Sequence, residues 1–194
     1  MALPPEDLLA RARAVRAIVL DVDGVLTDTS LIYGARGETL KAFSARDGFA
    51  IKLAQSEGIP VAILSGRFVA AVRARISDLG IPRELTIQGS RDKKTDITTL
   101  AGRLGLGLEQ LAFMGDDIPD LPALACVGLA ACPGDAAPEA RERAHLVCET
   151  PGGRGAVREL IRVILDSRGR WAELVEAWAA GSAARDFFAA TAGS

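Results

Sequence analysis

The chain has 194 residues, enough to bury roughly 70% of its unfolded surface in one domain without a disulfide or a structural metal. Apolar residues make up 49% of the chain and aromatic residues 5%, so we expect a core of Ala, Val, Leu and Ile of the α/β kind. The formal net charge of −2 argues against a nucleic-acid-binding domain, which is normally basic.

The N-terminal segment and the cysteines favour a cytoplasmic protein. No basic region followed by an apolar stretch opens the chain, so no signal peptide is expected. No run approaches about 18 apolar residues, so no membrane span is expected either. Cys126, Cys132 and Cys148 are odd in number and lack a C-x-x-C spacing, which indicates reduced, mostly structural thiols.

Strand and helix patterns alternate along the chain, which is typical of βαβ units. The expected elements of the first part are a helix over 5–15, a strand over 16–20, a β-hairpin of 31–33 with 39–43 and a helix over 47–57. Asp47 is the expected cap of that helix. A strand over 61–64, a helix over 68–79, a strand over 85–88, a helix over 92–104 and a strand over 111–114 follow.

The remaining segments are shorter. They cover 118–125, 127–130, 138–143 and 146–148, and a helix over 155–165 closes the core. The tail carries Trp171, Trp178, Phe187 and Phe188 among alanines, so we expect it to pack against protein. We assign residues 1–168 to a single domain and residues 169–194 to a tail that docks on the core or on a neighbouring subunit.

Two aspartates follow the first apolar run, one residue apart. Residues 18–20 suit a buried parallel strand, so Asp21 and Asp23 are expected at its C-terminal edge, where open α/β sheets bind ligands. Gly24 allows the backbone to turn around a small ligand. Carboxylates this close repel each other unless a cation lies between them or one is protonated. The pattern therefore predicts a hard metal ion, Mg²⁺, bound by oxygen atoms.

Other expected strands also end in polar or glycine-rich tips, which should meet at the same edge. These tips hold Ser65 with Gly66 and Asp116 with Asp117, and Lys93 or Lys94 follows a further strand. Together with the first aspartates they provide the groups that phosphoryl transfer requires.

Each group has a role in such a reaction. Asp21 is the expected nucleophile, which would form an aspartyl phosphate, and Asp23 the expected acid and base. The Ser65 hydroxyl and the Gly66 amide would hold phosphoryl oxygens, while the lysine would neutralise charge in the transition state.

Asp116 and Asp117 follow the strand over 111–114. Asp116 would anchor the Mg²⁺, and Asp117 would support it either as a ligand or through a neighbouring ligand. Taken alone, either residue could instead cap a helix, which is a common fate of Asp after a strand.

In this order the residues resemble the phosphatases of the haloacid dehalogenase superfamily. The four motifs of that superfamily match Asp21–Thr27, Ser65, Lys93 and Gly115–Asp120. The resemblance implies Asp21, the backbone carbonyl of Asp23, and Asp116 as metal ligands. It also implies a Rossmann-like, doubly wound and mostly parallel α/β sheet. The register of the motifs favours Lys93 over Lys94 as the catalytic lysine.

Over residues 12–168 the resemblance narrows to the phosphatases of 3-deoxy-D-manno-octulosonate 8-phosphate. The segments that carry it are Leu31–Tyr33, Gly37–Phe43, Arg46–Gly48, Ser65–Arg67, Gln88–Gly89 and Gly152–Glu159. It implies a β-hairpin insertion without a cap domain, Mg²⁺ as cofactor, a sugar-acid phosphate as substrate and a place in lipopolysaccharide biosynthesis. The substrate-binding positions that it implies are Asp23, Ser44, Arg46, Asp47, Gly48, Lys52, Gly66, Arg67, Arg75 and Lys93.

The short insertion bears on assembly. Only about 25 residues separate the first strand from the helix that follows, which is enough for a hairpin but not for a lid domain. The resemblance implies a homotetramer, in which the hairpin and C-terminal segment of a neighbouring subunit cover the active site.

Two positions depart from the family pattern. Thr29 stands where close relatives usually have Gly, and Ser65 replaces the usual Thr but keeps the hydroxyl group. The alternatives to the octulosonate are a nine-carbon sugar-acid 9-phosphate as substrate and a non-catalytic oligomerising module. A nucleic-acid 3′-phosphatase is disfavoured by the charge balance and the few aromatic residues.

Overall fold

Six parallel strands form the central sheet of the protein, whose computed structural model describes residues 6–35 and 37–181. The strands are β1 (Ala17–Leu20), β4 (Val61–Ser65), β5 (Thr86–Gln88), β6 (Leu111–Met114), β7 (Leu129–Cys132) and β8 (Leu146–Val147). Their order across the sheet is β5-β4-β1-β6-β7-β8, so β1 pairs with β4 on one side and with β6 on the other. The expected parallel α/β sheet is confirmed.

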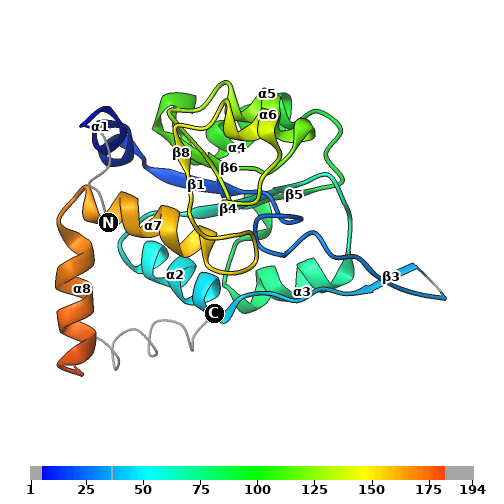
Figure 1. The fold of residues 1–194 in the computed structure, drawn as a ribbon, viewed down its shortest axis with the longest axis horizontal. Coiled ribbons are helices and arrows are strands. Elements are labelled where there is room, and N and C mark those ends of the chain that lie inside the picture. Colours follow the sequence, from blue (N-terminus) through cyan, green and yellow to red (C-terminus); the bar gives the residue numbers. More distant parts are fainter. Residues whose placement is uncertain (1–5, 36, 182–194) are drawn as a thin grey trace.

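Helices cover both faces of this sheet (Figure 1). In the view of Figure 1, α4, α5 and α6 lie above the strands, and α2, α3 and α7 lie below them. The helices are α1 (Glu6–Ala14), α2 (Ala45–Ser56), α3 (Ala70–Asp78), α4 (Lys93–Leu104), α5 (Leu121–Leu124), α6 (Pro138–Arg141), α7 (Ala156–Asp166) and α8 (Arg170–Ala179). Short 3₁₀ helices cover Arg83–Leu85, Leu108–Gln110 and Ile118–Asp120. Within the described ranges, no helix has the length and apolar character needed to cross a bilayer.

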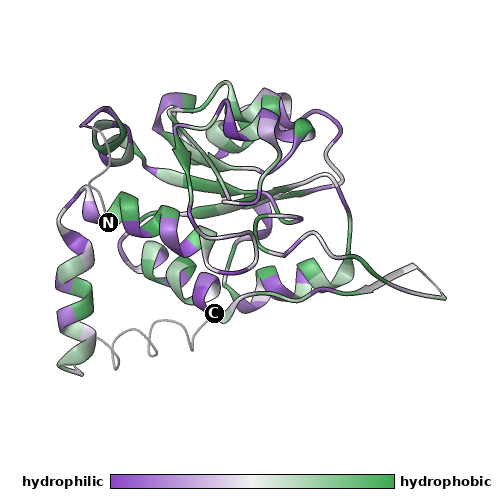
Figure 2. Cartoon of the chain, in the orientation of Figure 1, coloured by the Kyte–Doolittle hydropathy of each residue, from purple (hydrophilic) through white to green (hydrophobic). Residues whose placement is uncertain are grey.

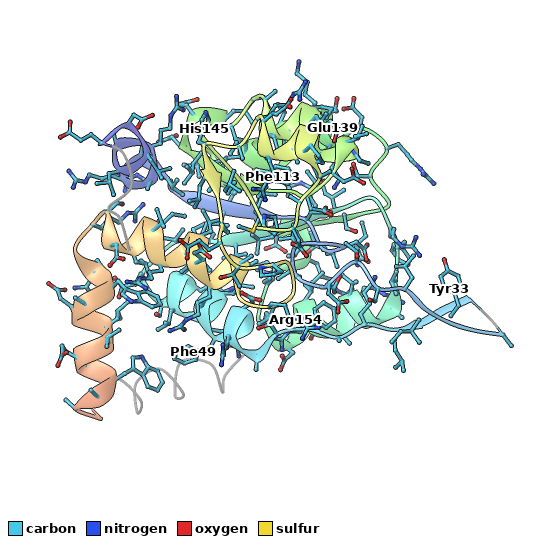
Figure 3. All side chains as sticks on the ribbon, viewed as in Figure 1. Tyr33, Phe49, Phe113, Glu139, His145 and Arg154 are labelled. Atoms are coloured by element: carbon cyan, nitrogen blue, oxygen red, sulfur yellow. The ribbon has the colours of Figure 1, made fainter. Side chains whose placement is uncertain are left out.

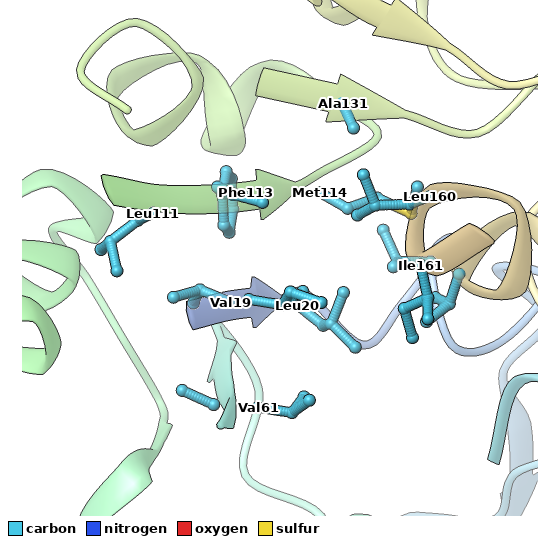
Figure 4. Close-up of a cluster of buried hydrophobic side chains, with 14 of the residues drawn as sticks. Val19, Leu20, Val61, Leu111, Phe113, Met114, Ala131, Leu160 and Ile161 are labelled. Carbon is cyan, nitrogen blue, oxygen red and sulfur yellow. The ribbon is translucent and has the colours of Figure 1, made fainter. Parts of the chain in front are cut away.

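The core is built from aliphatic side chains on both faces of the strands. Every residue of β1, β4, β6 and β7 is buried, and β1 is coloured as hydrophobic in Figure 2. Phe113 is fully buried on β6, while Leu160 and Ile161 of α7 lie against the sheet (Figure 4). Strands without polar alternation are typical of a sheet that is covered on both sides, so the polar groups at their ends stand out as functional candidates.

A two-stranded antiparallel hairpin projects from the body of the molecule between β1 and α2 (Figure 1). Its strands are β2 (Ile32–Gly34) and β3 (Gly37–Leu40), so the second strand begins and ends earlier than expected. The described residues between β1 and α2 form this hairpin and no cap domain, as predicted. Leu31, Ile32, Tyr33 and Leu40 are all exposed on it.

The start of α2 differs from the prediction. Ser44, not Asp47, is the N-cap residue, and its hydroxyl accepts a hydrogen bond from the Asp47 amide at 3.2 Å. Asp47 lies in the first turn of α2, where it is only 1% exposed, and its Oδ1 accepts from the Arg158 amide at 2.9 Å. Because the amides at a helix N-terminus attract a carboxylate, Asp47 stabilises the start of α7 instead. The prediction that Asp47 caps its own helix was wrong.

Helix α8 packs along α2 and α7 near the amino ends of the strands. The Trp178 ring meets the Phe49 ring edge-on, with 5.0 Å between the ring centroids. The Arg158 guanidinium lies 5.0 Å from the centre of the Trp171 ring. Arg170 donates two hydrogen bonds to the Glu57 carboxylate, at 2.7 and 3.1 Å. The two tryptophans of the tail thus pack on protein, whereas Phe187 and Phe188 lie outside the described residues.

The three cysteines are free thiols. Cys132 and Cys148 are buried, and burial raises the pKa of the Cys132 thiol to about 11. This thiol is therefore protonated at neutral pH, in agreement with the structural role that the sequence indicates.

Thr29 is the one residue other than glycine with a positive φ in the described part of the chain, at 67°. A β-branched residue is strained in this left-handed region. We expect Thr29→Gly to stabilise the protein by about 1 kcal/mol, because the relief of strain exceeds the entropy that glycine adds to the unfolded chain. Thermal unfolding should then show a midpoint about 2–4 °C higher.

The matched control is Thr98→Gly in the exposed middle of α4. There the backbone is helical, so the same substitution is expected to lower stability. A lower midpoint for both variants would contradict the assignment of strain to Thr29.

Candidate active site

Three neighbouring strands place polar side chains at one edge of the sheet. Asp21 follows β1, Ser65 ends β4, and Asp116 lies just beyond β6. Because β1 lies between β4 and β6, these residues come from adjacent strands. Lys93 begins α4 after β5, and its Nζ lies 3.0 Å from Oδ1 of Asp21. The structure therefore brings together the groups that the sequence places at separate strand ends.

A cluster of carboxylates forms the deepest part of this edge. One oxygen each from Asp21, Asp116 and Asp120 lies within 4.8 Å of the others. Burial, together with the nearby Asp120 carboxylate, raises the pKa of Asp21 to about 7. Burial and the Asp120 and Asp21 carboxylates raise the pKa of Asp116 to about 8. Such mutual repulsion is the electrostatic signature of a site that favours a cation.

Gly24 makes this close approach possible. Its φ of +80° is accessible to glycine, and a Cβ at this position would lie 2.0 Å from Oδ2 of Asp116. Any side chain here would push the Asp116 carboxylate away from Asp21. Glycine is therefore needed at this position for a steric reason, in addition to the turn that the sequence indicates.

Lys93 is the lysine of the site. Its side chain is 6% exposed, and its Nζ bonds the carboxylates of both Asp21 and Asp120. Burial alone would lower the pKa of Lys93, but these two carboxylates raise it above its ordinary value, so the ammonium group is stable. Lys94 is exposed on the outer side of α4. Between the two candidates, the structure places Lys93 at the strand ends.

Asp120 is a site residue that the sequence reasoning missed. It is 1% exposed, and its Oδ1 accepts a hydrogen bond from Lys93 at 2.5 Å. Its Oδ2 accepts from the amides of Asp116 and Asp117 at 3.0 and 3.3 Å. Asp120 thus connects the lysine to the loop after β6. The spacing within Gly115–Asp120 was visible in the sequence, but the role of its last residue depends on the fold.

The donor set fits Mg²⁺. Asp21 and Asp116 present buried carboxylate oxygens, which are the ligands that a hard divalent ion prefers. Asp120 belongs to the same cluster, and its oxygens accept hydrogen bonds from Lys93 and from two amides of the loop after β6. Oδ1 of Asp117 accepts from the Ile118 amide at 2.7 Å and caps the 3₁₀ helix over Ile118–Asp120. Asp21 and Asp116 would therefore hold the ion, together with the Asp23 carbonyl that the family resemblance implies.

Ser65 lies on the opposite side of Asp21 from β6, at the end of β4. Its side chain is buried, and its Oγ accepts a hydrogen bond from the Arg67 amide at 3.2 Å. This bond uses a lone pair of the Ser65 oxygen, so the hydroxyl proton can be donated to another acceptor. The Gly66 and Arg67 segment continues directly from this residue. This arrangement suits the binding of an anionic oxygen.

Asp23 lies farther out, and its side chain is 23% exposed. Lys41, which follows the hairpin, donates a hydrogen bond to its Oδ1. The Nε atom of Arg67 lies 3.9 Å from its Oδ2. Lys41 is a second residue that the sequence reasoning did not single out, although it belongs to the Gly37–Phe43 segment that carries the family resemblance.

A cavity of about 450 Å³ opens beside the start of α2. Its walls come from Phe43, Ser44 and Arg46 on one side and from Asp28, Gly153 and Arg154 on the other. Arg154 and Asp28 form an exposed ion pair of 3.3 Å at this cavity, and Figure 3 shows Arg154 near the start of α2. Of the expected substrate-binding residues, Ser44 and Arg46 line this space.

The other expected substrate-binding residues of α2 and α3 have different surroundings. Asp47 is turned toward the start of α7, as described above, and does not line the cavity. A Cβ at Gly48 would lie 2.0 Å from Nη2 of Arg75, so glycine makes room for the guanidinium. Arg75 bonds Asp78 and lies near the Ser44 carbonyl, which supports the cavity wall. Lys52 lies about one turn beyond Gly48 along α2 and is half-buried.

The buried carboxyls lead to a pH-dependent effect of Mg²⁺ on stability. A carboxyl whose pKa is raised on folding binds its proton more tightly in the folded chain. In metal-free protein its contribution to stability therefore falls as the pH rises from its unfolded pKa, near 3.8, through its folded pKa. With folded pKa values of about 7 for Asp21 and about 8 for Asp116, Mg²⁺ must displace protons at pH 6 but not at pH 9.

We therefore expect Mg²⁺ to raise the thermal midpoint more at pH 9 than at pH 6. Scanning calorimetry with and without the ion measures the difference directly. Asp116→Asn is the control, because loss of this ligand should remove most of the rise at both pH values. An equal rise at both pH values in the unmodified protein would contradict binding at the buried carboxylates.

Comparisons with known proteins identify relatives of this chain. A family model of haloacid dehalogenase-like hydrolases matches residues 84–160. The chain is 40% identical over 164 residues to the 3-deoxy-D-manno-octulosonate 8-phosphate phosphatase of Escherichia coli K12, an alignment that covers 84% of this chain and 86% of that protein. The corresponding phosphatase of Haemophilus influenzae is 42% identical over 156 residues, which cover 80% of this chain and 86% of that protein.

Solved structures give the same result. The crystal structure of the 3-deoxy-D-manno-octulosonate 8-phosphate phosphatase from Yersinia pestis superimposes with a TM-score of 0.82 and 39% identity, covering 85% of this chain and 88% of that one. The phosphatase from Moraxella catarrhalis, solved with a magnesium ion, a phosphate ion and a KDO molecule, gives a TM-score of 0.85 at 32% identity. That match covers 90% of this chain and 99% of the other.

Proposed function

Because the chain belongs to the 3-deoxy-D-manno-octulosonate 8-phosphate phosphatase family, we propose that it hydrolyses this eight-carbon sugar-acid phosphate to the free sugar acid and phosphate. It is a phosphatase of the haloacid dehalogenase type with Mg²⁺ as its cofactor. The observation that carries the proposal is the buried Asp21 carboxylate, which lies 3.0 Å from Lys93 and within the acidic cluster of Asp116.

The first chemical step joins Asp21 to the phosphoryl group. The carboxylate attacks phosphorus, the bond between phosphorus and the sugar oxygen breaks, and an aspartyl phosphate forms. Asp23 donates a proton to the departing sugar oxygen. Bound Mg²⁺ supplies positive charge that lowers the repulsion between Asp21 and the phosphoryl oxygens and allows Asp21 to be ionised.

The second step releases phosphate. Asp23, now a carboxylate, accepts a proton from a water molecule that attacks the aspartyl phosphate, and Asp21 is regenerated. Lys93 and the Ser65 hydroxyl hold phosphoryl oxygens in both steps, and the Gly66 amide has the same role. Asp120 keeps Lys93 in place through its 2.5 Å hydrogen bond, and Asp117 supports the loop that carries Asp116.

The cavity beside α2 supports a substrate that carries a carboxylate as well as a phosphate. Ser44 and Arg46 line it. The Nε atom of Arg67 lies 3.9 Å from Oδ2 of Asp23, so a second guanidinium lies at the active site. A guanidinium group matches a carboxylate in charge and geometry. Gly48 and Arg75 support this wall, while Lys52 adds a further positive charge along α2. Asp47 contributes indirectly, because it holds the start of α2 against α7.

Phosphate release from a panel of substrates tests the proposal. The panel holds octulosonate 8-phosphate, a nine-carbon sugar-acid 9-phosphate, a hexose phosphate and a nucleotide, each measured with Mg²⁺ and with a chelator. We expect the highest kcat/KM for the eight-carbon acid, and loss of activity with the chelator. Preference for the nine-carbon acid would change the assigned substrate but not the mechanism. No turnover on any phosphate would favour a non-catalytic binding module.

We further propose that the protein works in the cytoplasm as a homotetramer, and the hairpin is the feature that supports the assembly. An isolated two-stranded hairpin is marginally stable in water, and this one exposes a group of apolar side chains that a neighbouring subunit would cover. We expect light scattering to give about four times the chain mass of 20.3 kDa. In such an assembly the hairpin and the C-terminal segment of a neighbour would close the open active site.

Leu40→Glu tests this arrangement, because Leu40 is 61% exposed on the hairpin. The charge should produce smaller species, since a carboxylate is costly to bury at an apolar interface. Val147→Glu on β8, a residue that is 37% exposed and lies outside the hairpin and the C-terminal tail, is the matched control and should keep the mass unchanged. A fully active monomer of the unmodified protein would contradict the proposal of a shared active site.

A further inference from the structure

Lys41 occupies an unusual position at the base of the hairpin. The preceding residue, Leu40, is 61% exposed, whereas the Lys41 side chain has 0% exposure. Lysine is almost never fully buried unless its charge is paired. Here the ammonium group bonds the Asp23 carboxylate, so the hairpin delivers a buried cation to the edge of the active site.

The other strand of the hairpin also reaches this edge. The Tyr33 hydroxyl, on the projecting hairpin in Figure 3, accepts a hydrogen bond from Nη2 of Arg67 at 3.1 Å. Arg67 in turn lies 3.9 Å from Oδ2 of Asp23, while Lys41 bonds Oδ1. The Asp23 carboxylate therefore has a cation at each oxygen, and its orientation is defined by both strands of the hairpin.

This fixed orientation matters because Asp23 follows the strand by three residues and lies on a turn. Asp21 is buried and bonded to Lys93, but Asp23 is 23% exposed, so without the two cations its carboxylate would be freer to rotate. An acid that must protonate one oxygen of the substrate has to point at that oxygen, and a misplacement of about 1 Å can cost roughly 100-fold in rate.

We propose that Lys41 is a positioning residue that holds the Asp23 carboxylate toward the leaving oxygen of the substrate. This inference rests on the proposed function, since it assigns Asp23 the acid and base role. Lys41 itself is not required to touch the phosphoryl group. Its effect should therefore depend on how much the leaving group needs a proton.

Two substrates with different leaving groups distinguish positioning of Asp23 from direct binding of the phosphoryl group by Lys41. A sugar alcohol leaves slowly without a proton, whereas p-nitrophenolate leaves readily as an anion. We use kcat/KM, because it reports the steps up to departure of the leaving group and excludes the later attack of water. We expect Lys41→Met to lower kcat/KM for octulosonate 8-phosphate roughly 100-fold, but to change kcat/KM for p-nitrophenyl phosphate less than about 3-fold.

A double-mutant cycle adds a second readout. If Lys41 acts through Asp23, adding Lys41→Met to Asp23→Asn should cause little further loss with the sugar phosphate, because the positioned group is already absent. Lys94→Met is the matched control, since Lys94 is exposed on α4. Thermal unfolding checks that each variant is folded, and Lys41→Gln, which retains a hydrogen-bond donor, replaces Lys41→Met if that variant does not fold.

Equal losses of kcat/KM on both substrates in a folded variant would overturn the proposal, since they would mean that Lys41 binds the phosphoryl group itself. Full additivity in the double-mutant cycle would also overturn it. The unmodified enzyme tests the proposed function separately. If it prefers another alkyl phosphate to the octulosonate, that alkyl phosphate is compared with p-nitrophenyl phosphate, because the test of Lys41 depends only on the leaving group.

Discussion

Asp21→Asn is expected to abolish turnover while the fold persists. The amide is almost the same size as the carboxylate, but it is not nucleophilic, so no aspartyl phosphate can form. Asp21 is also 6% exposed in a cluster of like charges, and its removal reduces repulsion with Asp120. We expect kcat to fall by roughly 10⁴-fold or more, as is common for loss of a nucleophile.

Steady-state phosphate release measures this loss, and circular dichroism checks the fold. Asp166→Asn at the end of α7 is the control, because this aspartate is exposed and pairs with Arg162 of the same helix. Turnover of Asp21→Asn at the normal rate would refute covalent catalysis by this residue. It would also leave the acidic cluster as a metal site without a nucleophile.

Lys93→Met is expected to have the second-largest effect, on both activity and stability. The ammonium group bonds Asp21 and Asp120, at 3.0 and 2.5 Å, and removing it leaves two buried carboxylates without their shared cation. Loss of one partner from a buried ion pair costs about 3 kcal/mol of unfolding free energy. Loss of a cation that faces the phosphoryl group should also lower kcat by roughly 10²–10³-fold.

Urea unfolding in metal-free buffer measures the loss of unfolding free energy, and phosphate release with Mg²⁺ measures the loss of kcat. Lys94→Met is a close control, because it removes the neighbouring charge from the exposed side of α4. If Lys94→Met were inactive and Lys93→Met active, the placement of the catalytic lysine would be wrong.

The sheet and its catalytic edge were predictable from sequence for a physical reason. Strands buried on both faces appear as continuous apolar runs, and the polar residue that ends each run marks the carboxyl edge. Asp21, Ser65 and Asp116 each follow such a run, so their convergence requires only that the strands be parallel. The resemblance to a known family then supplied the register that separates Lys93 from Lys94.

Contacts between segments that are distant in the sequence could not be predicted from such patterns. Asp47 has the local pattern of a helix cap, but its bond to Arg158 depends on how α2 packs against α7. Asp120 and Lys41 act on Lys93 and Asp23 across separations of 27 and 18 residues. Periodicity and capping rules describe neighbours along the chain, so they carry no information on such pairs.

Capture of the covalent intermediate tests the central claim most directly. The enzyme is mixed with octulosonate 8-phosphate that carries a labelled phosphoryl group, quenched with acid within a single turnover and digested for peptide mapping. We predict label on the peptide that holds Asp21 when Mg²⁺ is present, and none with a chelator or with Asp21→Asn. Label on another residue, or labelling that persists in Asp21→Asn, would contradict the account.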